Sequence, residues 1–321
     1  MKNLILLFAI CLCLPLVGDD AAKKKFEVTK AKAEKGDAVA QNDLGVMYYD
    51  GTGTPKGIKD IKEAVKWWRK SADQGHALAQ FSLGWLHSEG EGVLEDDKEA
   101  FKLFRKAADQ GHVRAQFNLG LMYNNGEGVL QDHKEAVRWY RKAADQGHVS
   151  AQFNIGLLYF LGELVERDLK ETAKWYRKAA DQGYVTAQFN LGLMYERGDG
   201  VERDLKEAAK WYRKAADQGH VNAQEGLGLA YAVGKGVLED TLAAYAWWNI
   251  AAANGAEVAK RNKAKIARRM TPEQIVEAQA LSRDLLREIE AKKAGKPKEP
   301  EFPFAVPRLD PRTGLPINKR I

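Results

Sequence analysis

The chain repeats itself at a nearly constant interval. Its clearest phrase is Ala-Gln-Phe-Asn-Leu-Gly, and full or variant copies begin at Ala40, Ala79, Ala115, Ala151, Ala187 and Ala223. Successive copies are 39, 36, 36, 36 and 36 residues apart, and a second phrase, Arg-Lys-Ala-Ala-Asp-Gln-Gly, follows the same interval. A fixed period of this length is typical of repeat architectures. The sequence therefore predicts six copies of one structural unit.

Each unit is predicted to contain two helices. In the third copy, apolar residues recur at helical spacing over residues 115–123, and Gly126 ends that helix because glycine adopts the left-handed conformation easily. Asp132 is placed to cap a second helix, with Glu135 three residues on as the partner in a capping box. Gly147 ends this second helix.

Small residues occur where the two helices must come close. Ala115, Gly120 and Ala136 leave room for Trp139 and Tyr140 to fill the space between helices. A single pair of helices cannot bury its own apolar face, but stacked neighbours bury a continuous core. The predicted fold is therefore all-α, a superhelical solenoid of helix-turn-helix repeats.

The repeated phrases resemble a known family. Ala-Gln-Phe-Asn-Leu-Gly-Leu-Met-Tyr, Gly-x-Gly-Val-x-x-Asp and Lys-Glu-Ala-x-x-Trp-Tyr-Arg-Lys-Ala-Ala-Asp-Gln-Gly are similar to the Sel1-like repeat, a relative of the tetratricopeptide repeat. The resemblance covers residues 31–258. It implies a right-handed α/α superhelix that acts as an adaptor for protein partners.

The sequence outside the repeats suggests four further segments. Residues 1–18 are predicted to be a secretory signal, because Lys2 precedes the apolar run Leu4–Val17, which is short for a membrane span. A buried first helix and an uncleaved membrane anchor are the alternatives. A linker at 19–29, the solenoid at 30–258, capping helices at 259–293 and a basic, proline-rich tail at 294–321 complete the expected organisation.

The positive charge is concentrated at the end of the chain. The net charge is +6, and residues 292–321 carry +5 of it. The remaining body is nearly neutral, which disfavours a nucleic-acid partner because phosphate binding needs a contiguous basic face. The tail is expected to make at most a weak, salt-dependent contact with a membrane or an acidic partner.

No catalytic, cofactor-binding or metal-binding residue is predicted. The histidines at one repeat position (His76, His112, His148 and His220) lie in successive layers and cannot converge on one zinc ion. The tryptophans at another position are expected in the core, and the repeated arginines are expected to pair with the aspartates four residues on. The only cysteines, Cys11 and Cys13, fall in the signal, so a thiol site elsewhere is excluded.

Two groups of residues are candidates for binding a partner. The first is the asparagine of the repeated phrase (Asn118, Asn154 and Asn190), which would line a concave face, although a repeated asparagine can equally hydrogen-bond between repeats. The second is Phe160, Leu161 and Leu164, which replace polar residues or glycine in the fourth repeat. Local packing, or docking of the chain's own Phe302-Pro303-Phe304 segment, is the alternative for this group.

The favoured function is an exported, non-enzymatic scaffold that binds a protein or peptide. A cell-wall protein that binds or hydrolyses peptidoglycan or carbohydrate is one alternative. A regulator tethered to the membrane by its N-terminal segment is the other.

Overall fold

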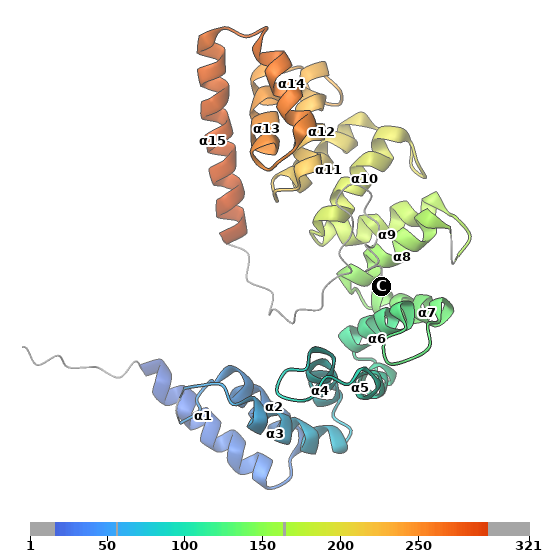
Figure 1. Ribbon diagram of the computed structural model, residues 1–321, viewed down its shortest axis with the longest axis vertical. Helices are drawn as coiled ribbons and strands as arrows, with labels where there is room; N and C mark the ends of the chain where they lie inside the picture. Colours follow the sequence, from blue (N-terminus) through green and yellow to red (C-terminus); the bar gives the residue numbers. More distant parts are fainter. Residues whose placement is uncertain (1–16, 56, 163–164, 295–321) are drawn as a thin grey trace, which may run out of the picture. The chain divides into compact units, whose positions relative to one another are not determined.

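The computed structural model describes residues 17–55, 57–162 and 165–294, and the regular elements in these residues are all α-helices (Figure 1). The first helices of the repeats are α2 (Ala38–Asp50), α4 (Ala77–Glu89), α6 (Val113–Asn125), α8 (Val149–Leu161), α10 (Val185–Arg197) and α12 (Val221–Val233). The second helices are α3 (Ile61–Asp73), α5 (Asp97–Asp109), α7 (His133–Asp145), α9 (Leu169–Asp181), α11 (Leu205–Ala216) and α13 (Thr241–Ala253). The flanking helices are α1 (Val17–Glu34), α14 (Glu257–Ala267) and α15 (Pro272–Ala294). Among these helices, none has both the length and the apolar composition that crossing a membrane requires.

The helices form two compact units, residues 1–139 and 140–321, and α7 is divided between them. In the first unit, α1 packs on α2, and the later first helices pack on their own second helix or on the second helix before it. In the second unit, α8 to α13 repeat this arrangement, and α14 and α15 both pack on α13. Each unit is therefore a stack of helix pairs in chain order, which confirms the predicted all-α solenoid.

The two helices of a repeat approach each other at a glycine. A Cβ atom on these glycines would lie 2.5 to 2.9 Å from an aromatic ring of the second helix, closer than real Cβ contacts. The pairs are Gly45–Trp68, Gly84–Phe104, Gly156–Tyr176, Gly192–Tyr212 and Gly228–Trp248. The prediction that a small residue permits close packing is confirmed.

An aspartate caps each second helix as predicted. A carboxylate oxygen accepts a hydrogen bond from the backbone N–H three residues on, in the helices that follow Asp60, Asp96, Asp132, Asp168 and Asp204.

The glutamate half of the predicted capping box is wrong. The N–H of Asp132 donates instead to the carbonyl oxygen of Tyr123 at 2.9 Å, and the corresponding bond recurs in the other repeats. Glu135 therefore has no cap N–H to accept, and it pairs with Arg138 at 2.6 Å on the helix surface. Such an exposed pair contributes a few tenths of a kcal/mol.

A buried glutamine ties each repeat to the helix before it. Gln188 in α10 is 5% exposed, and its Nε2 donates to the carbonyl oxygen of Ala180 at the end of α9, 3.0 Å away. Its Oε1 accepts from Gln218 Nε2 at 2.7 Å, and Gln218 also donates to Gly183. Equivalent bonds to a carbonyl of the preceding helix come from Gln41, Gln80, Gln116, Gln152 and Gln224. The phrases Ala-Gln and Asp-Gln-Gly are thus two parts of one hydrogen-bond network.

The last helix begins with a complete capping box. The hydroxyl of Thr271 accepts the N–H of Gln274 at 3.3 Å, and Gln274 Oε1 accepts the N–H of Thr271 at 3.0 Å. Both halves of the capping box are therefore formed at this helix start.

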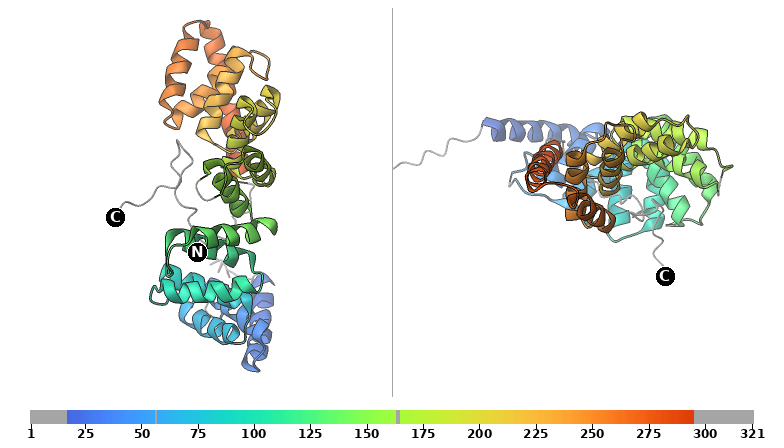
Figure 2. Two further views of the ribbon diagram at one scale, coloured as in Figure 1. Left: turned by 90° about the vertical axis from the view of Figure 1, so that its right-hand side faces the viewer. Right: turned by 90° about the horizontal axis from the view of Figure 1, so that it is seen from above.

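Helix α15 covers α13 (Figure 2). Leu285 and Ile289 are buried in one cluster with Trp247 and Ile250. Their partner helix, Thr-Leu-Ala-Ala-Tyr-Ala-Trp-Trp-Asn-Ile-Ala-Ala-Ala, carries no charged residue, whereas α11 carries five. A helix that is apolar on every side is covered on every side. The absence of charge in α13 was a sequence signal for this contact that the prediction did not use.

Replacing Gly228 with alanine is expected to lower the free energy of unfolding by about 1–3 kcal/mol, because the new Cβ would lie 2.7 Å from the Trp248 ring. Gly226, in the same helix, is the matched control. A Cβ there would lie 3.7 Å from Tyr212, and alanine is the better helix former by about 1 kcal/mol. Urea unfolding of the two single variants compares them. Equal loss of stability would contradict the close-approach interpretation.

Candidate functional site

The three candidate asparagines differ in exposure. Asn118, in the first unit, is only 3% exposed, so its side chain offers almost no surface to a partner. Asn154 and Asn190, in the second unit, are half-buried. The side chain of Asn190 lies close to the hydroxyl of Tyr176 on the preceding second helix. This is a contact between repeats, and a partner-binding role for Asn154 and Asn190 stays a prediction.

The apolar candidates of the fourth repeat are engaged in local packing. Phe160 and Leu161 are half-buried and contact the cluster formed by α8 to α11. The guanidinium of Arg167 lies 5.8 Å from the centre of the Phe160 ring. Leu164 and the Phe302–Phe304 segment lie outside the described residues. These contacts favour the packing alternative, and a partner contact at this place stays a prediction.

Three of the four repeated histidines serve as helix caps, whereas His76 makes no cap hydrogen bond. Nδ1 of His112, His148 and His220 accepts the backbone N–H of the residue three positions on, at 3.2 to 3.3 Å. The ring centre of His112 lies 4.6 Å from that of Phe81 in the preceding first helix, and His220 and Phe189 are the same distance apart. These three histidines therefore have a structural role at the helix starts.

Burial lowers the pKa of His112 and of His220 to about 4. For His112, the nearby charge of Arg114 acts in the same direction. Both rings are therefore neutral at physiological pH, which the cap requires because a protonated Nδ1 cannot accept a hydrogen bond. The described residues contain no group of three or more histidine, cysteine, aspartate or glutamate side chains that could share a metal ion.

The repeated arginines join neighbouring second helices. Arg105 and Arg213 pair with the aspartates four residues on, at 3.1 and 2.8 Å, as predicted. Four of the repeated arginines also place the guanidinium over the tryptophan of the next second helix, at 5.1 to 5.8 Å from the ring centre. The contacts are Arg105–Trp139, Arg141–Trp175, Arg177–Trp211 and Arg213–Trp247. These tryptophans are 1–3% exposed, which confirms that they belong to the core. The contacts between repeats were not predicted.

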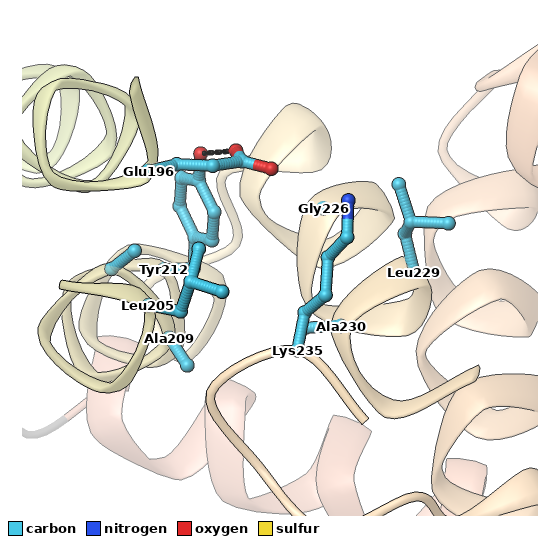
Figure 3. Close-up of a pocket in the computed structure, with 9 residues that line it drawn as sticks. Glu196, Leu205, Ala209, Tyr212, Gly226, Leu229, Ala230 and Lys235 are labelled. Atoms are coloured by element: carbon cyan, nitrogen blue, oxygen red, sulfur yellow. Dashed lines mark hydrogen bonds between the residues drawn. The ribbon is translucent and has the colours of Figure 1, made fainter. Parts of the chain in front are cut away.

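A pocket opens between the fifth and sixth repeats, within the second unit (Figure 3). Its apolar walls come from α11 and α12 and comprise Leu205, Ala208, Ala209, the Tyr212 ring, Leu229 and Ala230. Glu196, from the end of α10, and Lys235, from the turn after α12, add charged groups. The volume is about 40 Å³, room for roughly three water-sized groups.

The polar side of this pocket is held by one short hydrogen bond. Tyr212 donates its hydroxyl proton to Glu196 Oε2 at 2.6 Å. Burial, and then the bond to Glu196 and its charge, raise the pKa of Tyr212. The phenol is therefore a stable donor and a poor nucleophile, so the arrangement is suited to binding rather than to reaction.

Sequence reasoning missed this pocket. The signal was a departure from the repeated phrase, because Ala-Gln-Glu-Gly at residues 223–226 replaces Ala-Gln-Phe-Asn. Gly226, which lines the pocket, stands where Asn190 stands one repeat earlier.

Helix pairs of about 36 residues, stacked in order and tied by buried glutamines, define a solenoid of the tetratricopeptide-like class. The family model for the Sel1 repeat matches residues 38–76, 77–112, 113–148, 149–184, 185–220 and 221–255. Each match contains one first helix and one second helix. The chain therefore belongs to the Sel1 repeat family.

Proteins of known structure show the same fold. A protective antigen of uropathogenic Escherichia coli that displays an SLR fold is 32% identical, with a TM-score of 0.71, over 87% of this chain and 60% of that one. A Sel1 repeat protein from Oxalobacter formigenes is 30% identical, with a TM-score of 0.58, over 74% of this chain and 97% of that one.

A viral protein is similar over a shorter stretch. A sel1-like repeat-containing protein of Acanthamoeba polyphaga mimivirus is 40% identical over 65 residues, which is 20% of this chain and 12% of that one. The chain thus matches only a small part of this relative's length.

Acidification is expected to destabilise the stack through the histidine caps. The folded state keeps His112 and His220 neutral down to about pH 4, whereas the unfolded chain protonates them below about pH 6.5. Because the unfolded state then binds more protons, stability is lost as the pH falls from about 6.5 to about 4. After allowance for partial exposure, we expect a loss on the order of 1–2 kcal/mol per histidine.

Urea unfolding between pH 7 and pH 4.5 measures this loss. The control is the double variant His112→Asn/His220→Asn, because asparagine accepts a cap hydrogen bond without titrating in this range. A variant that loses as much stability on acidification as the natural chain would contradict the assignment.

Proposed function

We propose that this chain is an exported, non-enzymatic scaffold whose surface binds a protein or peptide partner. Membership of the Sel1 repeat family supports the interaction role. A large preformed helical surface also loses little conformational entropy when a partner binds.

One observation carries the non-enzymatic part of the proposal. Most of the polar side chains that recur along the repeats are engaged in the fold: aspartates and three histidines cap helices, glutamines join repeats, and arginines contact tryptophans. A hydrolase needs two carboxyl groups set apart across one cleft. The recurring carboxylates instead cap helices or pair with basic side chains on the helix surface.

The export part of the proposal rests on the N-terminal sequence. Lys2 and the apolar run Leu4–Val17, followed by Gly18-Asp19-Asp20, have the order of a secretory signal. These features lie mainly outside the described residues. We further propose that the basic tail makes only a weak contact, with an acidic partner or an anionic membrane, that weakens as salt is raised.

N-terminal sequencing of the protein purified from its own cells tests export. We expect the chain to begin at Asp19, because cleavage after Gly18 would remove the apolar run. A product that keeps this run and sediments with membranes would support the tethered regulator instead.

Binding and turnover together test the scaffold role. A partner found by cross-linking in cells should bind the purified full chain in a saturable, stoichiometric manner, measured by calorimetry with the purified partner. The same preparation, incubated with peptidoglycan, is expected to release no soluble sugars or peptides. Saturable release that one carboxylate substitution abolishes would replace the scaffold with the cell-wall enzyme.

A further inference from the structure

Gly226 is a mid-helix glycine that the fold does not require. It lies in α12, and unlike the glycines of the turns it does not have a positive φ. A Cβ atom there would meet its nearest neighbour, the Tyr212 ring, at an ordinary 3.7 Å. Gly228, two residues on, would place a Cβ 2.7 Å from Trp248. Glycine is the poorest helix former after proline, so its presence at position 226 needs another reason.

The other repeats show what a larger residue does at this position. Asn118, Asn154 and Asn190 occupy it in the third, fourth and fifth repeats. Asn190 lies close to the hydroxyl of Tyr176, which corresponds to Tyr212 one repeat later. Without that amide, the hydroxyl of Tyr212 bonds with Glu196 at 2.6 Å, and the space beside its ring is the pocket. Glycine therefore keeps open a site that asparagine would fill.

The walls and edges of the pocket define what it accepts. Its walls are aliphatic and aromatic. Figure 3 shows Tyr212 and Glu196 on one side and Lys235 and Leu229 on the other. Tyr212 occupies only one oxygen of the Glu196 carboxylate. The pocket thus offers an acceptor, a cationic donor and an apolar interior, which matches an aliphatic side chain flanked by a peptide N–H and a peptide carbonyl.

The size of the pocket selects a side chain over a free small molecule. At about 40 Å³ it admits three or four heavy atoms, about those of a valine side chain. So few contacts give a free ligand little affinity, whereas a side chain in a larger interface is also held by its neighbours.

We infer that this pocket binds one small aliphatic side chain from an extended segment of a partner protein. The N–H of that segment donates to Glu196, and its carbonyl oxygen accepts from Lys235. This inference rests on the proposed scaffold function and assigns that function a specific contact in the second unit.

A capped amino acid tests the pocket without knowledge of the partner. N-acetyl-L-valine N-methylamide, titrated into the full chain to concentrations above about 1 mM so that weak binding is populated, is expected to shift the methyl NMR signals of Leu205, Leu229 and Ala230 in a dose-dependent manner. The glycine and aspartate analogues of the probe should not shift them. No shift with the valine probe, or equal shifts with the glycine analogue, would overturn the inference.

The Gly226→Asn variant is the matching change in the protein. Asparagine at this position is compatible with the repeat, so the helical circular dichroism should be retained while the valine-probe shifts are lost. Leu238→Glu is the control, because Leu238 is 90% exposed and glutamate stands at the same position in the fourth and fifth repeats. It should keep the shifts. A folded Gly226→Asn chain that binds the probe as the natural chain does would refute the site.

A second variant and a second readout make the outcome decisive. If Gly226→Asn does not fold, Leu229→Glu replaces it, since Leu229 is 43% exposed and its substitution leaves the core intact. With the purified partner from the cross-linking experiment, either variant should weaken binding about tenfold or more. Unweakened partner binding would disprove the pocket contact and leave the scaffold role standing. Failure to find any protein partner would count against the scaffold role itself.

Discussion

Every repeat depends on a buried glutamine that has its partners only when the preceding helix is in place. Gln188 is 5% exposed, and its amide donates to the last turn of α9 while its oxygen accepts from Gln218. An unpaired buried amide costs about 1–3 kcal/mol, so a repeat that stood alone or stacked out of register would be penalised at this residue. The glutamines thus set the register of the stack, and the glycine contacts set the spacing within each repeat.

Because the buried glutamine needs a preceding helix, the hydrogen bonds at the two ends of the array differ from those between repeats. At the start of the described array, α1 takes the place of a preceding second helix, since Gln41 donates to the carbonyl oxygen of Ala33 at 3.1 Å. At the other end, Asn254 is too short to reach back as Gln218 does, and its amide bonds with Ile250 instead. The exposed side of the last second helix is then closed by α15, which explains the absence of charge in α13. The terminal helices therefore complete contacts that the repeats cannot make for themselves.

The sequence predicted most of the structure that one repeat determines locally. Helix ends at aspartate and glycine, the close packing at glycine and the burial of the tryptophans follow from spacing within 36 residues, and the structure confirms them. Contacts between repeats were largely missed, because the alignment of Arg177 with Trp211 depends on how successive layers are stacked. The capping box failed for a different reason, because the N–H of Asp132 reaches Tyr123 of the same repeat across a turn whose path the sequence pattern does not define. The pocket was missed because it arises from an absent side chain.

In a repeat protein, equivalent positions have the same kind of packing environment. A residue that departs from the repeated pattern therefore requires a cause of its own. The apolar residues Phe160 and Leu161 have one in local packing, and the uncharged surface of α13 has one in α15. The fold gives no such cause for Gly226, because neither the backbone conformation nor crowding by neighbouring atoms requires glycine at that position. Helix stability would favour almost any other residue. A position that weakens its own helix and opens a lined pocket is therefore the place where the demands of binding, rather than those of folding, best explain the sequence.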